Sequence, residues 1–539
     1  MQIYTQVRPL GADKEKAFLR ILVLIAYAVI VFVGVLNHEY WFDEAQAWNI
    51  ARDNSISGIF SFLKYEGHPP LWFLLLHVLT SLGLPCEAMG FFCWGLSVLS
   101  AAMILFLFPV KPYFKAAMIF CSGMLFVNSI IARSYCLINF LLCVIAVIYP
   151  KRKAHPLLFG LLIALIANTH LCMSGLAGIL GLYMLIDLIK DWKSVGKKQN
   201  IFNVLGIVIA AAGAAFLVLP LLESLSSNNF AANSALSFDS AVKSILKSPL
   251  IIILCCVAPN LSGIPIDIMT AVAELCLFAS IIVMRHKKRI FIIALTFILF
   301  YIAVCEVVWY STPNRASVFV FTLAAVFVMG QTENREAAAV QNAPKLPEKP
   351  KKGESVILRL LYKMKLADAK PDKTVSVLLA VLLALTVPSG VKYYIQDMNT
   401  EFVPSKSAAR YLKENMGEND LVVTYGDDAS QIIAYLPDVK FYSIAFNTFY
   451  SYNFHTDPEG TSDYSEFCRI AADYDNIYYV SRSGGSDIWN IAPLYESFEY
   501  VPFVLGQEQV RIWRVTEEEL KIWFDEAILN VRFDERRSL

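Results

Sequence analysis

The sequence is poor in charged residues. Only 17% of its 539 residues are charged, whereas 57% are hydrophobic, and the mean hydropathy is +0.52. Soluble domains carry about 25% charged residues, so the composition excludes an ordinary soluble enzyme and predicts a chain that crosses a bilayer many times. Acidic and basic residues balance at 46 each. Because no basic excess is present, we expect no nucleic-acid partner.

The sequence also lacks a cysteine framework and internal repeats. Most of the eleven cysteines lie inside apolar runs, at spacings that match neither a zinc site nor a disulfide set. Cys468 is the single cysteine of the late polar region, which argues against a disulfide-stapled outer domain. No repeat of 20 to 50 residues is visible, unlike the inverted repeats of many transporters. The first apolar run lacks a small-residue cleavage site, which favours a retained helix over a signal peptide.

Long apolar runs dominate the chain. Eleven have spanning length: 19–36, 69–84, 89–108, 135–150, 156–168, 171–189, 201–220, 266–284, 289–307, 315–330 and 374–389. Two more, 113–127 and 249–258, are shorter. If all thirteen crossed, the basic loops "KRKAH" and "KDWKSVGKK" would lie opposite the basic N-terminus, against the positive-inside rule. We therefore predict a polytopic α-helical membrane protein with eleven full spans and two broken or re-entrant segments, although Lys111 and Lys115 then lie outside.

This topology divides the chain into modules. Residues 1–330 form a transmembrane catalytic module with an outer loop, 37–68, and residues 331–373 form a cytoplasmic linker rich in Lys and Pro. Residues 374–399 contain the last span and a connector. Residues 400–539 combine a helical pattern, "SKSAARYLKENM", with short β-rich runs ("LVVTY", "VKFYSI", "NIYYVS" and "QVRIWRV"), which predicts an extracytoplasmic α/β domain.

The outer loop places two adjacent carboxylates, Asp43 and Glu44, in "HEYWFDEAQAWNIARD". Apolar residues follow at helical spacing (Ile56, Ile59, Phe60 and Leu63), so we expect the loop to lie in the membrane interface. Neighbouring residues on a helix diverge by about 100°, so the two carboxylates cannot act as a matched pair. One faces a cavity as a general base, and the other binds a metal ion or ties the loop down. The alternative is a solvated interfacial turn.

Further polar residues lie at the predicted outer ends of spans: His68, Arg133, Tyr135, His170 and Arg315. Charged groups at such depths are costly and usually face a cavity. His68 precedes two prolines that begin a helix, where the positive end of the helix dipole favours an anion. Each residue alone also fits a helix-entry turn or a snorkelling anchor.

Taken together, these motifs resemble the GT-C glycosyltransferases. The likeness rests on the order of the first span, the Asp-Glu outer loop, the "HPPL" entry to the next apolar run, the "RSY" before a later span and a histidine before another. It is closest to bacterial proteins similar to protein O-mannosyltransferases and the lipid A aminoarabinose transferase. The resemblance covers residues 15–190 well, is looser to 330, and is only architectural beyond.

The resemblance implies an inverting transfer of a sugar from a polyprenyl-phosphate donor to an acceptor outside the cytoplasmic membrane. It implies that Asp43 is the catalytic acidic residue and Glu44 its acidic neighbour. Arg133 and Tyr135 match residues that border the donor cavity. His68 replaces a lysine that contacts the donor phosphate in some relatives, which weakens that assignment because neutral His carries less charge.

Other readings stay open from the sequence. A flippase or exporter of lipid-linked sugars would use the same anionic-lipid cavity without chemistry. A polymerase or ligase acting on diphosphate-linked glycans would be expected to have larger, arginine-rich outer loops. The cofactor is unknown: a divalent metal ion is one option, with Glu44 as its candidate ligand, but the sequence contains no recognisable ligand set.

Overall fold

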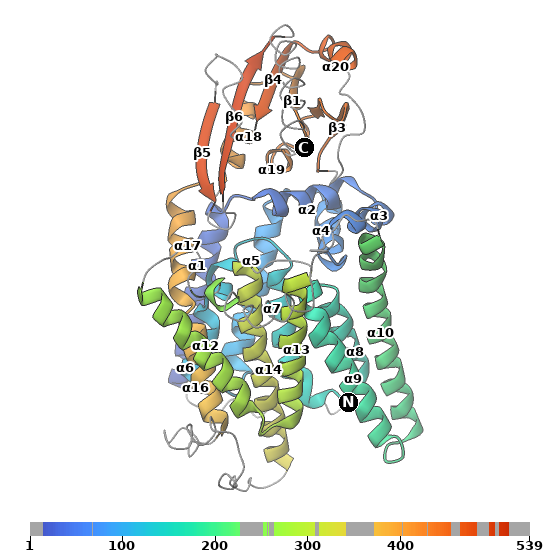
Figure 1. The fold of residues 1–539 in the computed structure, drawn as a ribbon, viewed down its shortest axis with the longest axis vertical. Coiled ribbons are helices and arrows are strands. Elements are labelled where there is room, and N and C mark those ends of the chain that lie inside the picture. The colour runs from blue at the N-terminus through green and yellow to red at the C-terminus, as the bar shows by residue number, and fades with distance from the viewer. Residues whose placement is uncertain are drawn as a thin grey trace, which may run out of the picture.

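The structure is a computed structural model that describes residues 14–66, 68–226, 252–255, 257, 264–307, 312–340, 371–401, 403–427, 429–453, 464–481, 495–501 and 506–516. A bundle of helices carries an α/β domain at one end (Figure 1). The chain is thus a polytopic helical membrane protein with a C-terminal α/β domain, as the sequence predicts.

Among the residues that the structure describes, eight helical segments are long and apolar enough to cross a membrane: Ala17–Asn37, Ala88–Phe106, Leu171–Asp191, Lys197–Phe216, Asp267–Met284, Lys288–Cys305, Pro313–Glu336 and Pro371–Asn399. They belong to α1 (Lys14–Asn37), α5 (Ala88–Phe106), α9 (Ser174–Asp191), α10 (Lys197–Ser226), α12 (Ile264–Met284), α13 (Lys288–Val307), α14 (Pro313–Val340) and the pair α16 (Pro371–Ala384) and α17 (Val387–Asn399). Three shorter apolar helices are α4 (Leu71–Ser81), α7 (Tyr135–Ile148) and α8 (Pro156–Ala167).

The expectation that 69–84 spans the membrane is wrong. Its helix, α4, has 11 residues, about 16 Å at the helical rise and half the thickness of a bilayer core. Both ends of α4 also lie near α2 (Phe42–Asp53). Trp72 lines a cleft together with Asp43 of α2, and His77 Nδ1 lies 2.7 Å from the Ala51 carbonyl oxygen of the same helix. α4 therefore stays at the end of the bundle that carries the α/β domain.

Residues 113–127, predicted not to cross fully, traverse the bundle in two pieces. Helix α6 (Pro112–Phe120) ends where Cys121 is extended, and the π-helix η1 (Gly123–Val127) continues. The start lies at the end of the bundle opposite the α/β domain, because Tyr113 donates to Ser376 Oγ at 3.1 Å near the start of α16. The far end lies at the top of α14, where Ser317 Oγ donates to Asn128 Oδ1 at 3.2 Å.

Because 113–127 crosses the bundle and 69–84 does not, Lys111 and Lys115 lie at the basic end of the bundle and not on the outer side, where the sequence had placed them. Lys115 Nζ donates to the Leu105 carbonyl oxygen at 2.6 Å, and its charged neighbours are Arg20 and Arg335, which lie at the basic end of the bundle. In the described part of the chain, 113–127 therefore traverses the bundle in place of 69–84. The conflict with the positive-inside rule disappears.

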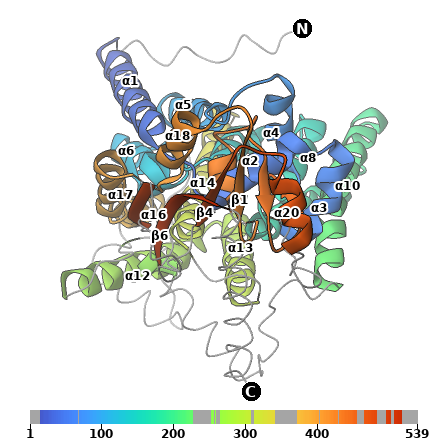
Figure 2. The ribbon, with the colours of Figure 1, turned by 90° about the horizontal axis from the view of Figure 1, so that it is seen from above.

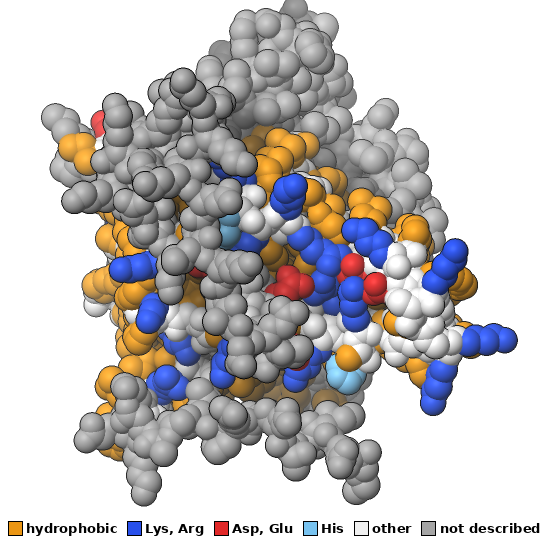
Figure 3. Space-filling model, turned by 90° about the horizontal axis from the view of Figure 1, so that it is seen from below, with side chains coloured by type: hydrophobic (Ala, Val, Ile, Leu, Met, Phe, Trp, Pro, Cys, Tyr) orange, Lys and Arg blue, Asp and Glu red, His pale blue; other side chains and the backbone are white. Residues whose placement is uncertain are grey.

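The basic loops gather on the face opposite the α/β domain (Figure 3). There Arg152 pairs with Glu333 at 2.9 Å, Arg289 with Asp187 at 2.8 Å, and Lys287 with Asp372 at 2.8 Å. The last helix of the 1–330 module, α14, extends to Val340, past the predicted boundary at 330. Residues 341–370 of the predicted linker and half of 249–258 lie outside the described residues.

The described part of the α/β domain is built on a six-stranded sheet with the order β3-β2-β1-β4-β6-β5. Its strands are β1 (Asp420–Thr424), β2 (Phe441–Ser443), β3 (Thr448–Tyr450), β4 (Asn476–Ser481), β5 (Tyr495–Val501) and β6 (Gly506–Val515), with helices α18 (Ser405–Asn415), α19 (Ser430–Ile433) and α20 (Tyr464–Ala471). β1 pairs in parallel with β2 and β4, and the other pairs are antiparallel. The four predicted β-rich runs and the predicted helix at 405–416 are all confirmed.

Candidate active site

The predicted outer loop folds into two helices, α2 and α3 (Ile56–Glu66). In α3, Ile59 and Leu63 are buried and Ile56 is exposed, as expected for an amphipathic helix. α2 is not surrounded by lipid headgroups, since it lies directly beneath the α/β domain (Figures 1 and 2), and every residue from Glu44 to Ala51 is buried.

Glu44 caps the N-terminus of α2 and ties this helix to the membrane helices. Its carboxylate accepts from the Trp41 backbone N–H at 3.1 Å, the reciprocal bond of a capping box. The second oxygen accepts from the Ala132 backbone N–H, just before α7. His38, at the end of α1, lies 3.2 Å from the same side chain. Glu44 is fully buried and does not line the cleft described below. Its position therefore supports the loop-tie role and gives no support to a role in catalysis or metal binding.

His38 links this carboxylate to the last membrane helix. Its Nδ1 lies 3.1 Å from Asp397 Oδ1 of α17, while its Nε2 faces Glu44. Burial alone would lower the pKa of His38, but the two carboxylates outweigh it and raise the pKa to about 10. His38 is consequently an imidazolium whose two N–H groups both donate, and it joins α1, α2 and α17.

Asp43, the neighbour of Glu44, points the other way. It lines a cleft together with Ala47, His68, Pro69, Trp72, Phe73, Arg133, Ser134 and Thr169. The Asp43 side chain is 45% exposed and pairs with Arg133 Nη1 at 2.5 Å. The two adjacent carboxylates therefore have different surroundings, because Asp43 and Ala47 face the cleft, whereas Glu44 is packed against other parts of the protein.

Arg133 is shared between two partners. Its Nη1 contacts Asp43, and its Nη2 lies 3.1 Å from His68 Nε2. Because a guanidinium only donates, His68 accepts through Nε2 and is neutral in this arrangement. The Arg133 side chain is only 11% exposed. A cation that is nearly buried and faces a cleft is suited to bind an anion such as a phosphate.

A second layer of polar residues lies deeper. The ring of His170 lies 6.0 Å from that of His68 and 5.4 Å from that of Tyr135. His170 Nδ1 accepts from the Cys172 backbone N–H at 3.2 Å. Burial and the neighbouring positive charges, chiefly that of Arg315, hold the pKa of His170 well below its usual range. His170 is thus a neutral imidazole whose proton lies on Nε2.

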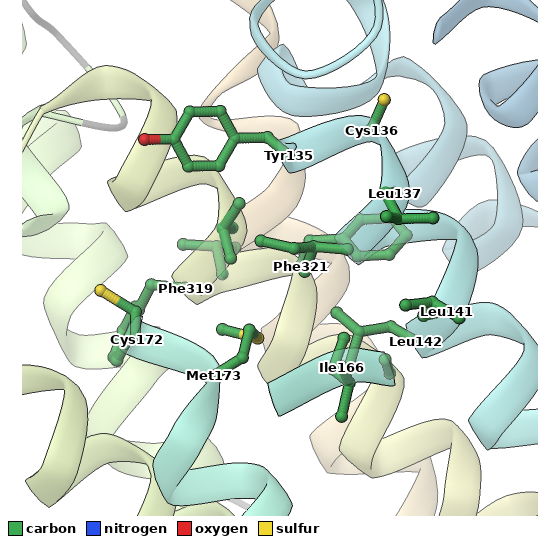
Figure 4. Close-up of a cluster of buried hydrophobic side chains, with 14 of the residues drawn as sticks. Tyr135, Cys136, Leu137, Leu141, Leu142, Ile166, Cys172, Met173, Phe319 and Phe321 are labelled. Atoms are coloured by element: carbon green, nitrogen blue, oxygen red, sulfur yellow. The ribbon is translucent and has the colours of Figure 1, made fainter. Parts of the chain in front are cut away.

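Tyr135 stands at the border between these polar groups and the apolar interior. Figure 4 shows it at the start of α7, at the edge of a cluster that includes Phe319 and Phe321 of α14 and Met173. Arg315 lies in the first turn of α14. Neither Tyr135 nor Arg315 lines the cleft itself.

The structure thus brings Asp43, His68 and Arg133 into one cleft. His170 and Tyr135 lie behind it, Arg315 acts on His170 through its charge, and Glu44 faces away. Among the described residues, no group of three or more His, Cys, Asp or Glu side chains is arranged to hold a metal ion.

The sequence analysis did not identify several residues that line the cleft, nor the buried ion pair that holds the nearby helices together. Ser134 and Thr169 stand next to predicted residues, and Trp72 and Phe73 follow "HPP" directly, so their proximity to the site could have been inferred. The pairing of His38 with Asp397 joins residues 359 positions apart, and no local pattern carries that information.

Comparison with protein-family models gave no match, and none was found among curated proteins. Among solved structures, the chain is similar to ArnT from Cupriavidus metallidurans bound to undecaprenyl phosphate. The match has 12% sequence identity and a TM-score of 0.46, and covers 91% of this chain and 97% of that chain. A similarity of this degree does not decide what the present chain does.

Proposed function

We propose that this protein is an inverting glycosyltransferase that moves a sugar from a polyprenyl-phosphate donor to an acceptor on the outer side of the cytoplasmic membrane. The observation that carries the proposal is the cleft, in which a half-exposed carboxylate, Asp43, stands beside a nearly buried guanidinium, Arg133. Helix α2, which carries Asp43, lies at the end of the bundle remote from the basic loops (Figures 1 and 3), where an outer site is expected.

In this proposal Asp43 is the general base. It accepts the proton of an acceptor hydroxyl as the hydroxyl oxygen attacks the anomeric carbon from the side opposite the phosphate. The bond between the anomeric carbon and the phosphate oxygen breaks, and polyprenyl phosphate leaves with the electron pair. Arg133 stabilises the negative charge that grows on the phosphate. No strong general acid is required, since the phosphate is already a good leaving group.

The pairing of Asp43 with Arg133 couples donor binding to base activity. Without donor, the carboxylate is held by the guanidinium at 2.5 Å and is occupied as an acceptor. A donor phosphate competes for Arg133 and draws it away from Asp43. His68, as a neutral acceptor on Nη2, orients the guanidinium during this exchange. The base then becomes available when a donor is in place, which limits unproductive proton transfer.

Turnover tests the proposal. Purified protein in lipid nanodiscs is incubated with a panel of polyprenyl-phosphate sugars and candidate acceptors, and released polyprenyl phosphate is measured. We expect wild type to release it and Asp43→Asn to lose at least about 100-fold in rate. Asp53→Asn is the matched control, because Asp53 lies on the same helix and pairs with Arg52 outside the cleft.

Two outcomes would contradict the proposal. Equal turnover by a folded Asp43→Asn protein would remove the base from its role. Movement of intact donor across vesicle membranes without release of polyprenyl phosphate would favour the flippase alternative.

A further inference from the structure

We infer that the α/β domain is a working part of the active site, in which it holds α2 through two amide side chains, Gln46 and Asn49. These are positioning residues for Asp43, and the inference rests on the proposed function for the role of Asp43 itself. Nothing in the local sequence marks them, because their partners are found about 380 to 410 residues further along the chain.

Gln46 and Asn49 lie on a different face of α2 from the cleft. Asp43 and Ala47, four residues apart, share the face that lines the cleft. Gln46 and Asn49, three residues apart, share a face turned by roughly 110° at 100° per residue. α2 therefore presents one face to the cleft and another to the α/β domain.

Five hydrogen bonds join that second face to the domain. Gln46 Nε2 donates to the Asn453 carbonyl oxygen at 2.9 Å, while Gln46 Oε1 accepts from Ser430 Oγ and from the Asn453 N–H, both at 2.8 Å. Asn49 Nδ2 donates to the carbonyl oxygens of Ser430 and Ser451, both at 2.8 Å. Ser430 begins α19, and the other two partners follow β3.

The two amide side chains that make these bonds are buried. Gln46 is 2% exposed and Asn49 is fully buried. A buried polar group that loses its hydrogen-bond partner destabilises the structure, so the docked arrangement is strongly preferred to one in which α2 shifts. Contacts around the amides strengthen the junction: Tyr40 stacks on Tyr435 with ring centroids 5.8 Å apart, and the Tyr435 hydroxyl accepts from the Tyr40 N–H at 2.9 Å.

α2 is thus fixed from two sides. Glu44 ties its first turn to the membrane helices, and Gln46 with Asn49 ties its middle to the α/β domain. Asp43 lies in the first turn between these anchors. A displacement of about 1 Å in a reacting group such as Asp43 can lower the rate 100-fold. The proposed donor contacts, His68 and Arg133, do not belong to α2, so a shift of α2 leaves them in place. Loosening the domain anchor should therefore lower kcat and leave donor KM nearly unchanged.

The test uses Gln46→Ala and Asn49→Ala in the full-length protein, with Asn415→Ala as the matched control. Asn415 is an exposed amide of the same domain whose side chain bonds within its own helix. We expect about a 10- to 100-fold fall in kcat for each anchor variant, with donor KM within threefold of wild type. Asn415→Ala should retain wild-type values. An unchanged kcat in a folded anchor variant, or a donor KM that rises by the same factor as kcat falls, would overturn the inference.

A double-mutant cycle tests the route of the effect. Ser430→Ala removes one bond to Gln46 from the domain side, at a residue that does not line the cleft. If Gln46 acts through the domain, the double variant Gln46→Ala/Ser430→Ala should be no slower than Gln46→Ala alone. Independent, multiplicative losses would contradict the inference.

Hydrogen exchange separates this inference from the proposed function. The backbone N–H groups of α2 should exchange faster in Gln46→Ala and Asn49→Ala than in wild type. Their exchange rates in Asn415→Ala should equal those of wild type. Protected α2 amides in the anchor variants would overturn the positioning role, whatever the activity is. A wild-type protein that transfers no sugar would overturn the proposed function and leave the exchange result standing.

Discussion

Replacing Asp43 with asparagine should slow transfer by at least about 100-fold and at the same time tighten donor binding. The change keeps the size of the side chain and removes its charge. In the structure Asp43 and the proposed donor phosphate share one cation, Arg133, so the resting carboxylate competes with the donor. A residue that served only as a base, without this competition, would change turnover and leave affinity alone.

The size of the affinity change follows from the exposure of the pair. Asp43 is 45% exposed and Arg133 is 11% exposed. An ion pair this open to solvent contributes about 1 kcal/mol or less, which is the amount the donor no longer has to displace. We therefore expect donor Kd to fall by up to about fivefold in Asp43→Asn. Loss of a general base lowers the rate by about 10² to 10⁴.

Equilibrium binding of a radiolabelled polyprenyl-phosphate sugar to nanodisc-embedded protein measures the first quantity, and release of polyprenyl phosphate measures the second. Asp53→Asn should alter neither. Weaker donor binding by Asp43→Asn would refute the reasoning, since it would mean that Asp43 attracts the donor, directly or through a metal ion. A rate within tenfold of wild type would refute the role as base.

Three other perturbations probe the same region. Arg133→Gln should weaken donor binding by about 2- to 30-fold, because a charge-assisted bond of about 1.5 to 3 kcal/mol is lost while the competing pair of about 1 kcal/mol disappears; unchanged Kd in a binding titration would contradict this. Glu44→Gln should destabilise the fold by about 3 kcal/mol, since His38 loses one of two buried counter-charges, and should lower Tm by several degrees; an unchanged melt would argue against the tie. Burial and the Glu401 carboxylate raise the pKa of Glu39 to about 8, so its neutral form stabilises the fold fully below about pH 4.5 and this stabilisation is lost as the pH rises through 8. Glu39→Gln should therefore melt at a higher temperature than wild type at pH 9, and the gap should shrink at pH 6; parallel melting curves at both values would contradict the assignment.

The membrane helices and the strands of the α/β domain could be predicted from the sequence. Which of the short apolar segments crosses the bundle could not be predicted as well. Long apolar runs predict membrane helices, and short runs of β-branched and aromatic residues that alternate with polar ones predict strands. Residues 69–84 and 113–127 are both apolar and similar in length, so hydropathy alone could not tell which one traverses the bundle. Lys115 carried the necessary signal, because a lysine predicted on the outer side was a misfit that the broken α6–η1 segment removes.

In the candidate site, the participating residues could be predicted from the sequence. The partners of their side chains and the domain that covers α2 could not. The pairing of Asp43 with Arg133 joins two residues that the sequence had already put on one side of the membrane. The division between Asp43 and Glu44 was expected from helix geometry, but the direction of each side chain depends on Ala132 and His38. The cover over α2 was missed, because an amphipathic pattern looks the same whether a helix is covered by lipid headgroups or by another domain.

The junction between α2 and the α/β domain has a consequence for how such proteins diverge. Of the five hydrogen bonds from Gln46 and Asn49, four end on main-chain atoms and only one on a side chain, Ser430 Oγ. Main-chain carbonyl oxygens are present whatever residue occupies a position, and among the partners only the Asn453 N–H would be lost to a proline. The amino-acid sequence of the domain can therefore drift widely while it still accepts the same helix, provided that the path of its backbone near residues 430 and 451–453 is kept. Within these five bonds, the side-chain specificity comes mainly from the two amides of α2.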